Sequence, residues 1–193
     1  MFNDKYGLTQ AVLEGRKTQT RRIIPKDFFS LTWDKRDDTL VYENSMGDFI
    51  DIRNSKYALC KAGEIVAVAQ SYRDCGGVNE EGIPMWEIIS SKVGGTNAGW
   101  SNKMFVRAEL MPHYVIITAV SVERLRDISD VDCMAEGIDY YEQEGFSWCS
   151  TEKLFDTPRE AYAALIDKVS GKGTWDSNPY VFVYDFELVK KWK

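Results

Sequence analysis

Alternating apolar and polar positions predict strands at both ends of the chain. The run YVFVYDFELV within residues 178–189 alternates apolar and aromatic positions, and residues 114–125 predict a longer strand. Residues 15–24 turn from a cationic loop into a β-prone run that ends at Pro25. The apolar run in 65–72 (IVAVAQSY) predicts a strand buried on both faces. We expect the first and last of these strands to share one sheet.

Three segments predict helices. Residues 4–14 place apolar side chains on roughly one face. Ser129 has the residue type of an N-cap, and Gly137 ends the short helix that follows it. The sequence Thr-Pro-Arg-Glu at 157–160 provides a cap, a proline at the first helical position and a glutamate at the third. That helix is expected to end near Gly171.

The remaining segments read as insertions in a single domain that covers residues 1–193. Residues 26–60 are mixed and polar, with a hairpin expected from TLVYE and FIDIR. Residues 73–103 are rich in Gly, Asn and Ser, which predicts a long loop or a weakly structured segment. Residues 139–156 are acidic and aromatic. Few helices and several strands favour an α+β, mainly β protein, built as a small closed or half-closed barrel with peripheral helices.

The distribution of charge along the chain limits the kinds of binding partner that we expect. The 193-residue chain has a formal net charge of −6, whereas residues 1–26 carry six Lys or Arg against two acids. A small basic focus on an acidic body suits a nucleotide or a short single strand and argues against broad duplex contact. No apolar run is long enough to span a membrane, and the first residues lack a signal-peptide core, so a cytoplasmic location is expected.

The stretch Gly-Arg-Lys-Thr-Gln-Thr-Arg-Arg at 15–22 carries the strongest chemical signal. Thr20 and Arg22 share a face once the strand is regular. Neighbouring cations and partial burial would depress the pKa of Lys17. A neutral lysine amine can act as a base or a nucleophile. The plain alternative is a solvated basic turn.

GRKTQTRR after an apolar helix resembles the signature of the ASCH domain family, a relative of the PUA RNA-binding fold. Three further segments are similar to phage-type members: KAGEIVAVAQSY at 61–72, the strand-then-helix segment 120–138, and TPREAYAALIDKVSGKGTW at 157–175 with the final strand. The resemblance implies a PUA-like barrel with a cleft beside the GRKTQTRR turn. It also implies a bacterial phage or prophage protein.

The resemblance further implies binding of RNA, of single-stranded nucleic acid, or of a nucleotide or nucleoside. Some small bacterial members are amidohydrolases that remove the acetyl group from acetylated cytidine. Their catalytic residues map onto Lys17, Thr20 and Glu136. The binding residues that we assign on this basis are Arg16, Arg21, Arg22 and Gln70.

The chain departs from the family pattern in two places. Phage-type members usually have Arg-Glu-Thr-Trp where this chain has Ala-Gln-Ser-Tyr at 69–72, so a cation and a carboxylate are lost. Gln70 keeps a donor and an acceptor, which leaves base-edge recognition open. After Met111-Pro112, His113 and Tyr114 precede Val115 where a cation, an aromatic residue and a second cation are usual, which weakens backbone-phosphate binding.

Other side chains have simpler readings. The four cysteines contain no Cys-x-x-Cys pair, so free thiols are expected, with no metal and no cofactor. His113 reads as a strand-end surface residue. The alternation of Trp100, Lys103, Phe105 and Arg107 resembles a base-stacking surface, although an ordinary strand edge is the preferred reading.

Two functions from different classes stay open, with a third beside them. One is a module that binds RNA or nucleotides through the cationic turn. The other is an amidohydrolase that acts on an acylated nucleoside, and the two differ in whether Lys17, Thr20 and Glu136 converge. A protein-interaction module that uses the insertions is the third.

Overall fold

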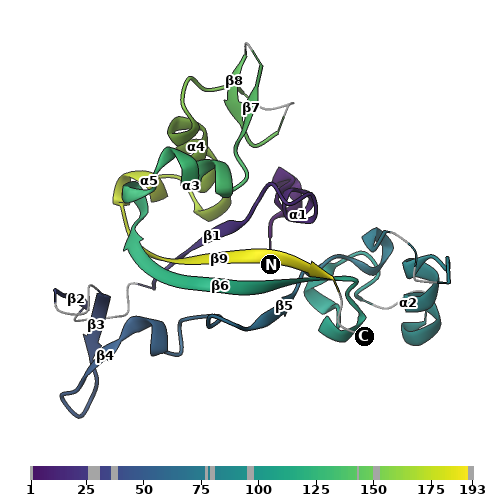
Figure 1. Cartoon of the computed structure of the whole chain (residues 1–193), viewed down its shortest axis with the longest axis horizontal. Coiled ribbons are helices and arrows are strands. Elements are labelled where there is room, and N and C mark those ends of the chain that lie inside the picture. Colours follow the sequence, from purple (N-terminus) through teal and green to yellow (C-terminus); the bar gives the residue numbers. More distant parts are fainter. Residues whose placement is uncertain are drawn as a thin grey trace.

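The computed structural model describes residues 2–25, 31–35, 39–76, 78, 81–94, 98–142, 144–149 and 153–190. Within these ranges the chain is an α+β protein with antiparallel sheets. The main sheet has the strand order β1-β9-β6-β5 (Figure 1). Its strands are β1 (Gln19–Ile23), β9 (Tyr180–Lys190), β6 (His113–Arg124) and β5 (Ile65–Ala67).

Strand β9 joins the two ends of the chain in one sheet, as the sequence predicts. It pairs with β1 so that Thr20 lies opposite Tyr184 and Arg22 opposite Phe182. On its other side β9 pairs with the long β6, with one irregularity between Ile117 and Ala119. The side chains of β9 are buried alternately on both faces of the sheet, which explains its apolar and aromatic pattern.

The expected barrel does not close within the described residues. The main sheet is open, with β1 and β5 as its edges. Strand β5 covers only three residues, and Ile65 in it is 45% exposed, so the prediction of a long strand buried on both faces is wrong. After Val68 donates its N–H to the His113 carbonyl, the chain turns into a short 3-10 helix, Tyr72–Asp74. The apolar run therefore supplies an edge strand and a turn.

Two small sheets and a helix lie in the segments read as insertions. Strands β2 (Leu31–Asp34), β3 (Thr39–Glu43) and β4 (Phe49–Asp51) form one sheet, and the predicted β3–β4 hairpin is confirmed. Strands β7 (Asp139–Tyr141) and β8 (Gly145–Ser147) form a second hairpin. Helix α2 (Met85–Val93) lies where a loop was expected, and it buries Ile89. The Gly and Asn content of residues 73–103 favoured a loop, although residues 85–93 themselves form a helix.

The other helices agree with the capping signals. Ser129 caps α3 (Asp130–Ala135), and Thr157 caps α4 (Pro158–Ser170) by accepting the Glu160 N–H. The predicted first helix is divided, because Gly7 at φ +68° separates a 3-10 turn, Asp4–Tyr6, from α1 (Leu8–Leu13). A short α5 (Thr174–Ser177) follows α4. None of the described helices has the length and apolar character needed to cross a membrane.

Apolar clusters on both faces of β9 hold these elements together. One cluster packs α3, α4 and β8 against the sheet; the other packs β3, β5 and α1 against the opposite face. Figure 1 places α3, α4 and the β7–β8 hairpin on the side of β1. The end of α3 therefore lies beside the turn that precedes β1, where Thr18 donates its N–H to the Ala135 carbonyl at 2.9 Å.

Candidate functional site

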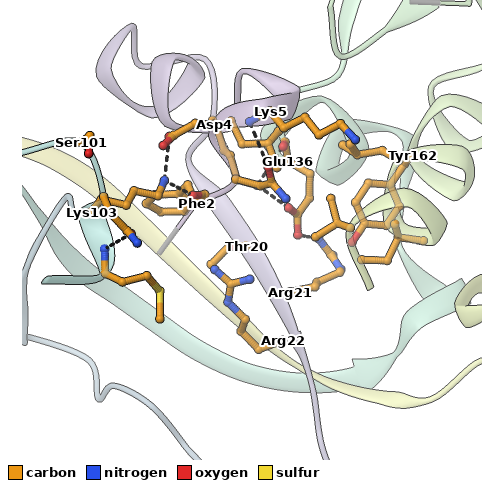
Figure 2. A pocket seen from close by; sticks show the side chains of 18 residues that line it. Phe2, Asp4, Lys5, Thr20, Arg21, Arg22, Ser101, Lys103, Glu136 and Tyr162 are labelled. Carbon is orange, nitrogen blue, oxygen red and sulfur yellow. Dashed lines mark hydrogen bonds and ion pairs between the residues drawn. The ribbon is translucent and has the colours of Figure 1, made fainter. Parts of the chain in front are cut away.

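A pocket of about 490 Å³ lies between β1, the end of α3, α4 and two irregular segments (Figure 2). Residues 2–5 form one of these segments, and residues 101–104 form the other. Strand β1 and the turn before it contribute Lys17, Thr20, Arg21 and Arg22. Glu136, the residue that follows α3, also lines the pocket. The convergence of Lys17, Thr20 and Glu136 on one pocket was the question that the sequence left open.

The turn before β1 fixes the position of Lys17. Gly15 adopts φ +74°, a left-handed conformation that glycine tolerates at the end of a helix. The N–H groups of Arg16 and Lys17 both donate to the Ala11 carbonyl, which folds the chain back over the end of α1. The Lys17 side chain consequently enters the pocket instead of pointing to solvent.

The Lys17 ammonium is buried and fully hydrogen-bonded. Its side chain is 2% exposed. The Nζ atom donates to the backbone carbonyls of Gln19 and Glu136, each at 2.8 Å, and to the Oε2 atom of Glu136. Because an ammonium has three donors, these contacts use all of them. The plain reading of a solvated basic turn therefore fails at Lys17.

Burial is the main cause of a lowered pKa at Lys17. The Glu136 carboxylate opposes this effect, while Arg22 and Arg21 add to it as weaker causes. The sequence predicts the direction correctly but assigns it chiefly to the neighbouring cations. Burial is the larger cause because Gly15 and the end of α1 turn the side chain inward.

Arg21 is held by three carboxylates. Its side chain is 1% exposed, its Nε donates to Glu123 at 2.7 Å, and its Nη1 donates to Glu136 Oε1 at 3.3 Å. Asp132 lies 3.6 Å from Nη2, too far for a hydrogen bond. Burial lowers the pKa of Arg21, but Glu136 and Glu123 outweigh it and the net pKa is raised. Arg21 thus stays charged and orients Glu136.

Thr20 and Arg22 lie on the other face of β1, as the alternation predicts. Both line the main pocket, and both also line a smaller apolar cavity of about 90 Å³ beside Tyr184 and Phe186. Phe2 lines both cavities as well. In Figure 2 the Thr20 and Arg22 side chains lie below Phe2. These two residues therefore face the boundary between the two cavities.

Two of the predicted site residues lie elsewhere. The Gln70 Oε1 atom lies 3.0 Å from His113 Nδ1, within hydrogen-bond distance, and the Gln70 amide donates to the Asp74 carbonyl. Gln70 lines a separate pocket of about 220 Å³. Arg16 is exposed and pairs with Glu14 and Asp139. Neither Gln70 nor Arg16 is among the residues that line the Lys17 pocket.

The sequence assigned no site role to several residues that line the pocket, among them Phe2, Lys5, Lys103 and Tyr162. Lys5 is one of the basic residues counted in 1–26, and Lys103 is part of an aromatic and basic alternation. That segment is a 3-10 turn, Lys103–Phe105, so the strand-edge reading is wrong. Tyr162 comes from α4, and burial raises its pKa well above the usual value, so its phenol keeps its proton. No local pattern connects these residues to Lys17.

The charge of the pocket is opposite to that of the chain. Its lining contains five cations, Lys5, Lys17, Arg21, Arg22 and Lys103, and two acids, Asp4 and Glu136. Such a lining attracts an anion. The described residues contain no cluster of His, Cys, Asp or Glu that could hold a metal ion, and Cys60, Cys75, Cys133 and Cys149 are free thiols.

The pocket lining can attract an anion towards Arg22 and Lys5, and a proton can pass between Lys17 and Glu136, which share a hydrogen bond. Comparison of the chain with models of protein families, with curated proteins and with solved structures finds no match. The function of the pocket is therefore inferred from its geometry and from the sequence motifs that form it.

Proposed function

We propose that this protein binds RNA or a nucleotide in the Lys17 pocket. The observation that carries the proposal is a pocket with five cations and two acids on a chain whose net charge is −6. Because the rest of the chain is acidic, the attraction for an anion is concentrated at this pocket. A single strand end or a mononucleotide fits that distribution, and a broad duplex does not.

The size and the walls of the pocket support the same ligand class. A volume of about 490 Å³ lies within the usual range for small-molecule sites. Leu8, Leu165 and Ile166 supply an apolar wall, and Arg22 with Lys5 supplies positive charge. A nucleotide combines a flat, weakly polar base with an anionic phosphate, so it complements both parts.

We also propose that the chain is an ASCH-type protein with a PUA-like arrangement of strands. The GRKTQTRR turn, the segment 120–138 and the last helix and strand support this proposal. The antiparallel pairing of β1 with β9 is compatible with it. The open main sheet is the feature that differs from a closed barrel.

Binding can be tested with one arginine of β1 and one arginine of the turn before it. Cytidine monophosphate and a short single-stranded RNA are titrated against wild type, Arg22→Gln and Arg16→Gln by calorimetry. Arg22→Gln should weaken binding by roughly fivefold to a hundredfold, the size expected for one charge-assisted contact. Arg16→Gln removes the same charge outside the pocket and should leave affinity within about twofold. Equal effects of both changes, or no binding by wild type at low salt, would reject the proposal.

A second function is favoured by one contact. Lys17 Nζ donates to the Glu136 carboxylate, and Thr20 lines the same pocket, which supports the arrangement that an amidohydrolase requires. Proton transfer from Lys17 to Glu136 leaves a neutral amine and a carboxylic acid. The amine takes the Thr20 hydroxyl proton as Thr20 Oγ1 bonds to the acyl carbon. The C–N bond then breaks, and Glu136 gives its proton to the leaving amine; water hydrolyses the acyl ester.

Acetylated cytidine is the substrate for testing this activity, with release of cytidine as the measurement. Thr20→Val should abolish release and Thr20→Ser should retain part of it, since only serine keeps a hydroxyl. Lys17→Met should abolish release as well. Activity that survives Thr20→Val would reject the mechanism, and inactive wild type that still binds nucleotide would leave binding as the function.

A further inference from the structure

Lys103 ties two segments of the pocket mouth together. Its side chain is 14% exposed. The Nζ atom donates to the Phe2 carbonyl, to Asp4 Oδ1 at 2.7 Å and to Thr9 Oγ1 at 3.2 Å. All three acceptors lie within residues 2–9. Figure 2 shows Lys103 beside Phe2, with the dashed lines meeting at its ammonium.

The segment that Lys103 holds forms part of the pocket lining. Residues 2–5, which we call the strap, each line the pocket. The Phe2 ring packs on Phe186 with a centroid distance of 5.5 Å, and the Lys17 ammonium lies 6.0 Å from the Phe2 centroid. Phe2 lines both the large pocket and the small apolar cavity, as Thr20 and Arg22 do, so it lies at the boundary between them.

Asp4 is the anionic partner of the Lys103 ammonium. Its carboxylate accepts hydrogen bonds from Lys103 and from the Thr9 hydroxyl. Asp4 itself is 57% exposed, whereas its lysine partner is largely shielded. A partly shielded ammonium needs an anionic partner, and the exposed carboxylate can exchange for another anion at small cost.

We propose that Asp4 is a built-in competitor for the phosphate of the ligand at Lys103, so that a phosphate-bearing ligand displaces the strap. This inference rests on the proposed nucleotide binding. When the phosphate takes the place of Asp4 on Lys103, the strap loses its ion pair and is held there by the weaker bond from Lys103 to the neutral Phe2 carbonyl. The Phe2 ring can then leave Phe186, and the two cavities join in front of Thr20 and Arg22.

The test compares Asp4→Asn with Glu14→Gln. Both changes raise the net charge by one, but Glu14 pairs with Arg16 outside the pocket. Affinities for cytidine monophosphate and for cytidine are measured by calorimetry. Asp4→Asn should tighten binding of the monophosphate by about two- to fivefold, the range of an exposed ion pair. It should change the affinity for cytidine by less than the affinity for the monophosphate, and Glu14→Gln should leave both unchanged.

Two further measurements separate competition from a general charge effect. In a Lys103→Gln background, Asp4→Asn should no longer tighten binding of the monophosphate. Hydrogen exchange of residues 2–9 should become faster when wild type is saturated with the monophosphate, while the segment around Glu136 becomes protected. Asp4→Asn should show the faster exchange at 2–9 without ligand.

The outcomes distinguish this inference from the proposed function. If wild type binds the monophosphate and Asp4→Asn binds it no more tightly, competition is rejected and nucleotide binding stands. Slower exchange at 2–9 on ligand binding would also reject competition, because the strap would then close over the ligand. If none of the proteins binds nucleotide, the proposed function is rejected and the competition with it.

Discussion

Lys17 and Glu136, 119 positions apart in the chain, are joined twice: the Lys17 ammonium donates to both the carboxylate and the backbone carbonyl of Glu136. The side chains are 2% and 6% exposed. The backbone contact fixes the end of α3 against the β1 turn, and the carboxylate contact neutralises a buried charge. The same pair therefore stabilises the fold and lines the pocket.

Removing one member of this pair should destabilise the protein strongly. Lys17→Met leaves Glu136 with Arg21 as its remaining counter-charge among the described residues and removes the ammonium from two carbonyls. We expect a loss of about 3–5 kcal/mol in the free energy of unfolding. Arg16→Met, on the same turn but exposed, should cost less than about 1 kcal/mol. Urea denaturation measures both, and equal losses would contradict the assigned role of Lys17.

Gly137 should be required for the backbone turn that follows Glu136. It adopts φ +99°, while an added Cβ would make only an ordinary van der Waals contact, 3.5 Å from the Lys17 Cβ. Gly137→Ala should cost about 1–2 kcal/mol of unfolding free energy, because the left-handed conformation is unfavourable for alanine. Gly63→Ala is the matched control, since Gly63 has φ +86° and open space around it. Both variants should lose stability, but only Gly137→Ala should weaken nucleotide binding measured by calorimetry.

The buried thiol of Cys133 should make stability fall at alkaline pH. Burial raises the pKa of Cys133 from 9.0 to about 12 in the folded protein. Between these values the unfolded chain loses the thiol proton and the folded chain keeps it, so stability decreases as pH rises. The slope approaches about 1.4 kcal/mol per pH unit. The difference in unfolding free energy between wild type and Cys133→Ala should shrink with this slope above pH 9; a constant difference would contradict it.

The parts of the fold that were predicted correctly depend on local signals. Ser129 and Thr157 each carry a side-chain oxygen that caps a helix, and β9 alternates between two buried faces. These signals require only neighbouring residues. The prediction of a buried strand at 65–72 is wrong because apolar composition does not reveal that β5 is an edge strand. Edge position depends on the order of strands in the sheet.

The candidate site shows the same difference between residues marked by local sequence and residues brought together by long-range contacts. Lys17, Thr20 and Arg22 lie close together in the sequence, and the resemblance to the ASCH family added Glu136. Gln70 was placed in the pocket by analogy, but the chain turns away after β5 and directs Gln70 to His113. The strap and Lys103 were missed because their contact joins residues 99 positions apart and no motif marks it.

Nucleic acid binding should depend only weakly on salt. Each phosphate neutralised on a single strand contributes about −0.7 to the slope of log affinity against log salt. Three cations, Arg22, Lys5 and Lys103, line one pocket, which limits the phosphates contacted at once to two or three. We expect a slope of about −1.4 to −2.1 for a short single-stranded RNA.

Fluorescence anisotropy between about 50 and 300 mM salt measures this slope, a range that spans the physiological screening regime. Asp4→Asn frees Lys103 and should steepen the slope by about 0.7, whereas Arg22→Gln should make it shallower by the same amount. A slope steeper than about −4 would require a wide phosphate-tracking surface, which the acidic remainder of the chain opposes.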